Sequence, residues 1–246
     1  MREATAAKEM FRMVARTAAL VLALAVAAAA DYPKPEIEKA DIDAEDLAKF
    51  KEAYTFYLDG VEFEKEGSWV SASQAYRKAV QIYHNYPDAQ YGLGRMALRL
   101  GRLDEAEEAL REALTLKPEL HQAHTELGSV HYRRGDYKKA AFEYKEALRQ
   151  NPDDTIARYN LGNAYRNLDK PKDAVEEYEK TLSLDPAYVD CYYNMALAFE
   201  DLGQVEKAIA AYDKFIEAAA GDPDQKQWID RAKEYKEKLR EEQKEK

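Results

Sequence analysis

The chain has 246 residues and carries 37 basic and 47 acidic side chains, which gives a formal net charge of −10. A nucleic-acid-binding surface needs a concentrated basic face, and this acidic balance gives no support for one. The single cysteine, Cys191, excludes an intrachain disulfide framework, and the scarcity of glycine and proline argues against an all-β protein rich in turns.

Residues 1–30 differ from the rest of the chain. A start with several basic side chains is followed by an uncharged apolar run at 17–30 that ends in alanines, which is typical of a secretory signal peptide. A helix of that length rises about 21 Å, less than the roughly 30 Å hydrocarbon core of a bilayer. We therefore expect a signal peptide cleaved after Ala30 and an exported, periplasmic protein. The alternative is a retained membrane anchor at 10–30, facing the non-cytoplasmic side.

Residues 31–42 contain prolines and acidic side chains and are predicted to be a linker. A helix is expected to begin at Asp43, because Asp43 and Asp46 resemble a capping box. The apolar residues that follow at helical spacing are Leu47, Phe50 and Tyr54.

From there on, small residues recur every 34 positions, in blocks 53–86, 87–120, 121–154, 155–188 and 189–222. The eighth position of the successive blocks is occupied by Gly60, Gly94, Gly128, Gly162 and Ala196. The twentieth position is alanine in every block: Ala72, Ala106, Ala140, Ala174 and Ala208. Chance does not explain agreement at so many sites, so the blocks are internal repeats.

Each block contains two apolar stretches at helical spacing, which predicts a pair of helices. The first helix is expected to end in a left-handed turn at Gly67, Gly101, Gly135 and Gly203. Ser68 and Asp136 are predicted to cap the second helix, and Pro171 fits its first turn. A proline cannot continue a helix, so the second helices of the middle blocks are expected to stop before Pro118, Pro152 and Pro186.

The blocks strongly resemble the tetratricopeptide repeat family over residues 53–222. The best matches are YGLGRMALRLGRLDEAEEALREALTLKP, TELGSVHYRRGDYKKAAFEYKEALRQNP and YNLGNAYRNLDKPKDAVEEYEKTLSLDP. The resemblance implies an all-α fold: a solenoid of antiparallel helix pairs at 43–222, wound as a right-handed superhelix with capping helices at its ends.

The two end units depart from the pattern, as capping repeats do. The first has His84 where a proline is usual, and the fifth has Ala220, so its second helix is expected to continue to Gly221 and Pro223. Residues 223–246 are predicted to form a capping helix, with apolar residues at helical spacing: Trp228, Ala232, Tyr235 and Leu239.

No nucleophile elbow, phosphate-binding loop, dinucleotide fingerprint or zinc-protease motif occurs in the sequence, so we expect no enzyme activity and no cofactor. Cys191 stands where other blocks have alanine, which favours packing over a reactive thiol. Three histidines lie close together, but their positions face a neighbouring helix and no further ligand completes a metal site: His121, His124 and His131. The tripeptide that begins at Arg134 is read as the turn between two helices.

The resemblance implies that the first helix of each unit lines a concave groove that binds another protein or peptide. The candidate groove residues are Tyr57, Tyr91, Arg95, Arg99, Gln122, Thr125, Arg133, Tyr159, Asn160, Asn163, Arg166, Tyr193 and Asn194. The arginine band, which comprises Arg95, Arg99, Arg133 and Arg166, favours an acidic or C-terminal segment as the ligand.

A second interpretation of these residues stays open. Tyrosine and asparagine are common at these positions in the family whatever the ligand, and the arginines could pair with Asp88, Glu126 or Glu200. The lysine and asparagine pattern by which some relatives clamp a terminal carboxylate is absent, because the corresponding windows hold Tyr57 and Val61, or Tyr91 and Arg95.

The sequence therefore predicts a non-catalytic scaffold, adaptor or assembly factor that holds a peptide or protein segment. A permanent structural subunit of a large membrane-associated complex, tethered by residues 10–30, is the alternative. An enzyme that shares its site with a partner is a third possibility, which no sequence feature favours.

Overall fold

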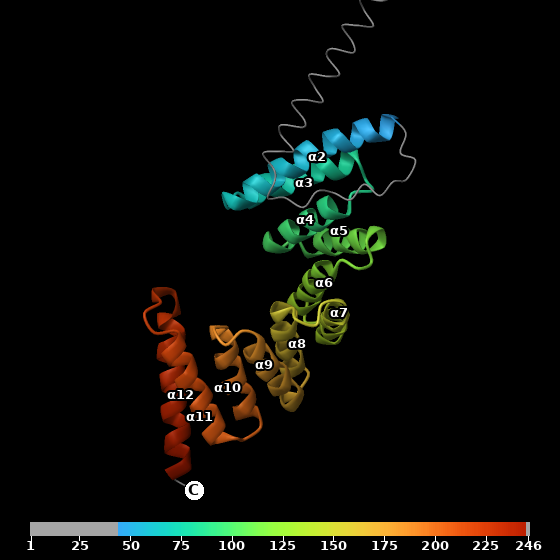
Figure 1. Ribbon diagram of the computed structural model, residues 1–246. Helices are drawn as coiled ribbons and strands as arrows, with labels where there is room; N and C mark the ends of the chain where they lie inside the picture. Colours follow the sequence, from blue (N-terminus) through green and yellow to red (C-terminus); the bar gives the residue numbers. More distant parts are fainter. Residues whose placement is uncertain (1–43, 245–246) are drawn as a thin grey trace, which may run out of the picture. The chain divides into compact units, whose positions relative to one another are not determined.

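The computed structural model describes residues 44–244 (Figure 1). The predicted signal peptide or anchor, the linker and the proposed cap Asp43 all lie outside the described residues. Within 44–244, no helix is both long and apolar enough to cross a membrane.

The described chain is a solenoid of antiparallel helix pairs with no strand between residues 44 and 244. The first helices are α2 (Ala44–Lys65), α4 (Pro87–Arg99), α6 (His121–Arg133), α8 (Thr155–Asn167) and α10 (Val189–Asp201). The second helices are α3 (Trp69–Ile82), α5 (Leu103–Leu116), α7 (Tyr137–Gln150), α9 (Pro171–Leu184) and α11 (Val205–Ala218). A short 3-10 turn, η1 (Pro223–Gln225), leads into the final helix α12 (Lys226–Lys244).

Each first helix packs against its own second helix, and each second helix packs against the first helix of the next pair (Figure 1). Contacts therefore run almost entirely between neighbours along the chain. An array of this kind presents one row of first helices and one row of second helices, so residues at equivalent repeat positions lie along the same row.

The small eighth residue of each block admits a large side chain from the second helix. A Cβ atom placed on Gly128 would lie 2.6 Å from Cε1 of Tyr144, and one on Gly162 would lie 2.6 Å from Cε1 of Tyr178. Both tyrosines are almost completely buried. The ring of the second helix thus lies directly on the backbone of the first, which only a missing side chain permits.

The turns between paired helices use the left-handed backbone conformation. Gly135 has φ 82°, and the glycines expected at the same turn in three other units also have positive φ angles: Gly67, Gly101 and Gly203. In the fourth unit Asp169 occupies this position with φ 58°. Non-glycine residues adopt this conformation at a cost, although aspartate tolerates it better than most.

The predicted helix starts are only partly correct. Pro171 is the first residue of α9, as expected. Ser68 and Asp136 precede α3 and α7, but neither side chain accepts a capping hydrogen bond, so these two cap predictions are wrong. Their backbone ψ angles of 65° and 57° lie outside the extended region that a capping residue normally adopts. Asp154, which is extended, accepts the capping bond from Ala157 N at 2.9 Å.

The two ends of the array also differ from expectation. Because no break interrupts residues 44–65, the N-terminal cap and the first helix of the first unit form one continuous helix. At the other end, α11 stops at Ala218 and does not continue to Pro223, so that prediction is wrong. Gly221 takes a positive φ of 92° and turns the chain into α12, whose Ala232 and Leu239 are buried.

Replacement of Asp169 by glycine should stabilise the protein. The Asp169 side chain is exposed, and the left-handed conformation costs a non-glycine residue about 1–2 kcal/mol. Glycine avoids this cost, but it loses more backbone entropy on folding, which offsets part of the gain. We expect Asp169→Gly to raise the free energy of unfolding by up to about 1 kcal/mol in urea denaturation. The matched variant Gly135→Ala should lower it, and a stabilised Gly135→Ala protein would contradict the explanation.

Candidate functional site

All of the candidate groove residues lie on first helices. Tyr57 is on α2; Tyr91, Arg95 and Arg99 are on α4; Gln122, Thr125 and Arg133 are on α6; Tyr159, Asn160, Asn163 and Arg166 are on α8; Tyr193 and Asn194 are on α10. They therefore belong to the same row of helices, and their contacts show which of them a ligand could still use.

Polar contacts join neighbouring first helices at residues 35 positions apart. Arg133 donates to the carbonyl oxygen of Leu98 at 2.6 Å, and Arg166 pairs with Asp201 at 2.9 Å. Between them along the row, the Asn167 amide donates to the hydroxyl of Tyr132 at 2.9 Å. At least one such contact, called a staple below, therefore joins each pair of neighbouring first helices from α4 to α10.

The two asparagines with the clearest partners are also engaged within the protein. Asn194 donates to the hydroxyl of Tyr159 at 2.6 Å, and Asn163 accepts a hydrogen bond from the hydroxyl of Tyr178 at 2.6 Å. These amides hold one tyrosine of the same row, Tyr159, and one of the second helix α9, Tyr178. Asn160 is partly exposed and Gln122 is exposed, whereas Thr125 is buried and bonds to Asp154 at 3.2 Å.

The predicted tyrosines contribute more to packing than to an open surface. Tyr57 meets Tyr76 and Tyr86 with ring centroids 5.7 and 5.2 Å away. Tyr193 is buried between rings of α11 and α12. Burial raises the pKa of Tyr91 to about 12, so its hydroxyl stays protonated at neutral pH.

The arginine band has different partners from those considered in the sequence. Arg95 pairs with Glu64 and lies 5.5 Å from the Tyr91 ring centroid. Arg99 is exposed and lies 4.2 Å from the ring centroid of Trp69. Glu200, one of the expected carboxylates, instead accepts the Tyr212 hydroxyl.

Glu126 is the carboxylate that the band surrounds. Burial raises its pKa, while the positive charges of Arg95, Arg99 and Arg133 oppose that rise. No ion pair links Glu126 to any arginine of the described chain within 4.0 Å. The exposed guanidinium groups of Arg99 and Arg133 thus keep donors that a second carboxylate could use.

A pocket of about 310 Å³ lies at the C-terminal end of the row. Four aromatic side chains line it: Tyr159, Tyr193, Phe215 and Trp228. Its polar lining comes from Asp190, Asn194 and Gln225. The sequence analysis identified Tyr159, Tyr193 and Asn194. It missed Phe215, Gln225 and Trp228, which lie outside the first helices, and it also missed Asp190 on α10. Asp190 could have been found from the sequence, because it occupies the same block position as the candidate groove residue Gln122.

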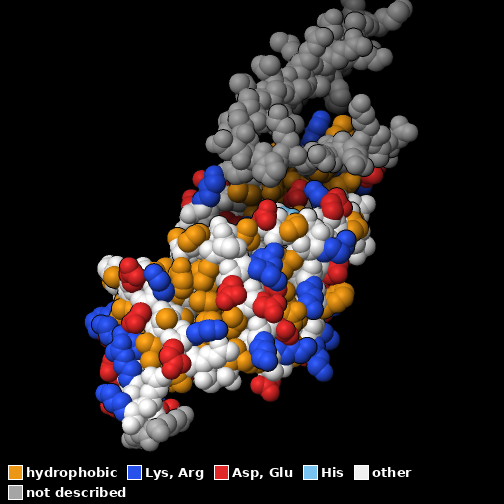
Figure 2. Space-filling view, turned by 60° about the horizontal axis from the view of Figure 1, so that its bottom comes forward, with side chains coloured by type: hydrophobic (Ala, Val, Ile, Leu, Met, Phe, Trp, Pro, Cys, Tyr) orange, Lys and Arg blue, Asp and Glu red, His pale blue; other side chains and the backbone are white. Residues whose placement is uncertain are grey.

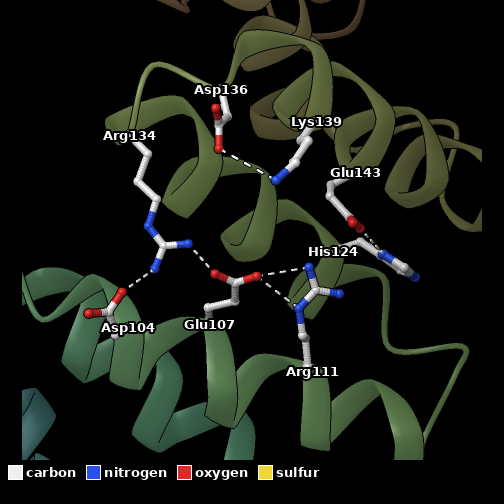
Figure 3. Close-up of polar contacts among 8 residues, drawn as sticks. All are labelled: Asp104, Glu107, Arg111, His124, Arg134, Asp136, Lys139 and Glu143. Atoms are coloured by element: carbon white, nitrogen blue, oxygen red, sulfur yellow. Dashed lines mark hydrogen bonds and ion pairs between the residues drawn. The ribbon is translucent and has the colours of Figure 1, made fainter.

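The side of the second helices carries a network of ion pairs (Figure 3). Arg134 reaches from the α6–α7 turn to Asp104, at 2.6 Å, and to Glu107 on α5. Arg111 pairs with the same Glu107 at 2.8 Å. Arg134 therefore serves to tie two units together at the turn in which the sequence placed it.

The histidines and the cysteine have structural partners. His124 Nδ1 lies 2.8 Å from Glu143, and His131 is buried, which lowers its pKa. Cys191 is buried and its pKa is raised to about 12. In the described part of the chain, no three His, Cys, Asp or Glu residues form a cluster that could hold a metal ion.

The face drawn in Figure 2 carries basic and acidic side chains side by side, with hydrophobic side chains exposed between them. This mixture differs from the single-signed surface that binds nucleic acid. It is the pattern of a polar protein surface with scattered apolar contacts.

Comparison with sequence families agrees with the repeat pattern. The profile of the tetratricopeptide repeat family matches residues 64–127 and, in two overlapping matches, residues 125–189 and 159–223. These matches span more than half of the chain. A search of curated proteins found no significant match.

Solved structures of similar fold include tetratricopeptide repeat proteins. A crystal structure of MamA is 24% identical, with a TM-score of 0.61, and the match covers 71% of this chain and 95% of that chain. PilF of Pseudomonas aeruginosa is 22% identical, with a TM-score of 0.63, over 71% of this chain and 80% of that chain. YrrB, described as having an unusual peptide-binding site, is 22% identical, with a TM-score of 0.59, over 74% and 95%. At these identities the likeness shows that the fold is shared.

The Arg134–Glu107 contact should make stability depend on acid pH. Hydrogen bonds from Arg134 and then Arg111 lower the pKa of Glu107 from 4.5 to about 2. The stabilisation is therefore complete above pH 4.5 and is lost as the pH falls towards 2. We expect Arg134→Gln to cost about 1 kcal/mol at pH 7, with a smaller difference from wild type at pH 3.

Urea denaturation of both proteins at several pH values measures this. Lys139→Gln is the matched control, because Lys139 forms only an exposed contact with Asp136 at 3.7 Å. A difference between Arg134→Gln and wild type that stayed constant from pH 7 to pH 3 would reject the role of Glu107.

Proposed function

Since the chain belongs to the tetratricopeptide repeat family, whose fold serves as a protein-interaction scaffold, we propose that it is a non-catalytic adaptor or assembly factor. It holds an extended peptide or protein segment along the row of first helices. The segment is acidic where it crosses α4 and α6.

The observation that carries this proposal is the pair of exposed guanidinium groups at equivalent positions of neighbouring first helices. Arg99 ends α4 and Arg133 ends α6, and both are exposed. Cations at helix C-termini also favour the helix dipole, so part of their role is structural. Arg133 uses one nitrogen on Leu98, which leaves further N–H groups for a ligand carboxylate.

Glu126 is the carboxylate of the protein with which an acidic ligand competes for the arginines. Its carboxylate occupies the field of the same arginines, so an incoming acidic side chain competes with it for their charge. The burial that raises the pKa of Glu126 makes its charged form costly, so a better-solvated ligand carboxylate is the better partner for these arginines.

We also propose export of the protein. The support is the order of basic, apolar and small residues in 1–30, which is typical of a signal peptide. The alternative function, in which residues 10–30 tether a structural subunit to a membrane-associated complex, uses the same apolar run, although its length favours the signal peptide. Dependence of solubility on detergent separates the two.

The groove proposal predicts that charge reversal at Arg99 and Arg133 abolishes partner binding. We expect Arg99→Glu/Arg133→Glu to reduce recovery of partners in affinity purification from the native source by at least tenfold, because two attractive contacts become repulsive. Circular dichroism checks that the variant retains its helices.

The matched control reverses two lysines on second helices. Lys138→Glu/Lys172→Glu changes the net charge equally but alters exposed side chains of α7 and α9. It should leave recovery unchanged, and Glu126→Gln should preserve or increase it. Undiminished recovery by Arg99→Glu/Arg133→Glu, or equal loss by the lysine control, would reject an acidic segment on this face.

A further inference from the structure

The pocket at the C-terminal end of the row has the walls of an aromatic cup. Tyr193 meets Trp228 at 5.5 Å with an interplanar angle of 71°, and Phe215 at 5.2 Å with an angle of 65°. Tyr193 thus meets both neighbouring rings edge-on, and all three rings line the same pocket. Trp228 remains 43% exposed, an unusual exposure for so large an apolar side chain.

The aromatic cup arises where the repeat ends. Trp228 lies 34 positions after Asn194 and therefore continues its register into the capping segment. Phe215 stands where the first three blocks have alanine, and it is buried. A large ring on α11 and a large ring on α12 thus replace the small and polar residues of the inner repeats.

The pocket offers hydrogen-bond acceptors that no group of the described chain uses. Asp190 lies in the first turn of α10, is exposed, and forms no ion pair within the described chain. The Oε1 atom of Gln225 is buried without a hydrogen-bond partner. Asn194 uses its amide nitrogen on Tyr159 and on the Asp190 carbonyl, so its own side-chain oxygen is the group left over.

A neighbouring contact shows that the same ring attracts cations. The guanidinium carbon of Arg231 lies 5.9 Å from the Trp228 ring centroid and 5.6 Å from that of Tyr235. Arg231 does not line the pocket. Trp228, which stays 43% exposed, lines the pocket together with Asp190.

We propose that this pocket receives an arginine or lysine side chain of the bound partner segment. Aromatic faces attract a cation, the free carboxylate of Asp190 pairs with it, and the unpartnered Gln225 oxygen accepts one of its N–H groups. The assignment deepens the proposed function and rests on it. The partner segment is then acidic at α4 and α6 and basic at its contact with α10 and α12.

Other side chains fit the pocket less well. An acidic side chain would be repelled by Asp190. An aliphatic side chain would cover the rings but would leave the buried Gln225 oxygen without a donor, a loss that hydrogen-bond energetics make costly. A basic side chain satisfies the aromatic and the polar lining together.

Small amide probes test the pocket without a partner. The probes are the N-acetyl N-methylamides of arginine, lysine, norleucine and glutamate, titrated into the full chain. The readout is the NMR signals of the two tryptophan indole N–H groups, which Trp69→Phe assigns. We expect the arginine and lysine probes to shift Trp228 saturably at millimolar concentrations and to leave Trp69 unmoved.

Variants then separate charge from shape. Asp190→Asn should weaken the arginine probe about threefold to fivefold, and Asp173→Asn, an exposed residue of α9 outside the pocket, should not change it. Trp228→Leu removes the ring and also the NMR reporter, so binding of the lysine and arginine probes to this variant is followed by calorimetry. We expect no saturable binding.

Three results would overturn the proposal: equal binding of the norleucine probe, binding of the glutamate probe, or no shift of Trp228 with any cation. Each leaves the function above standing if partner recovery still depends on Arg99 and Arg133. Conversely, cation binding with no effect of those arginines would reject the acidic-segment proposal alone.

Discussion

Four of the five units depend on one contact, in which a second-helix side chain packs directly on a first-helix glycine: Gly60, Gly94, Gly128 and Gly162. Tyr144 lies on Gly128 and Tyr178 on Gly162, with no room for a single extra carbon. The tyrosines are buried, and their hydroxyl groups contact polar side chains of the first helix: that of Tyr178 donates to Asn163, and that of Tyr144 lies 3.3 Å from the Ser129 hydroxyl. The tyrosine therefore sets the distance between the paired helices and also reaches the row proposed to bind a partner.

That geometry gives the first-helix row two roles. Its polar side chains connect one unit to the next, as in Arg166 with Asp201 and Asn194 with Tyr159. What remains for a partner is the part of each side chain that these staples do not use, above all at Arg99 and Arg133. Because a hydrogen bond to Leu98 holds Arg133 and the Trp69 ring lies against Arg99, a ligand meets groups whose conformational entropy has already been reduced.

Much of the fold could be predicted from the sequence, because a glycine or proline at a fixed repeat position has a local physical reason. Gly135 in a left-handed turn and Pro171 at a helix start follow from backbone sterics alone. The partners of the groove residues could not be predicted, because contacts between first helices join positions 35 apart and depend on how neighbouring units are offset. The aromatic cup was missed since Phe215 and Trp228 meet only when α12 packs on α11. The caps expected at Ser68 and Asp136 failed because tertiary packing fixes backbone angles that an isolated helix start would not adopt.

The most direct measurement of the central contact is the change in the free energy of unfolding that Gly128→Ala causes. It is measured in two backgrounds, the wild-type protein and the Tyr144→Ala variant. Alanine favours an exposed helix over glycine by about 1 kcal/mol, so the sign of the effect reports whether the ring lies on that backbone. We predict that Gly128→Ala destabilises the protein when Tyr144 is present and stabilises it relative to its own parent when Tyr144→Ala has emptied the space. Stabilisation by Gly128→Ala in the presence of Tyr144 would contradict the account.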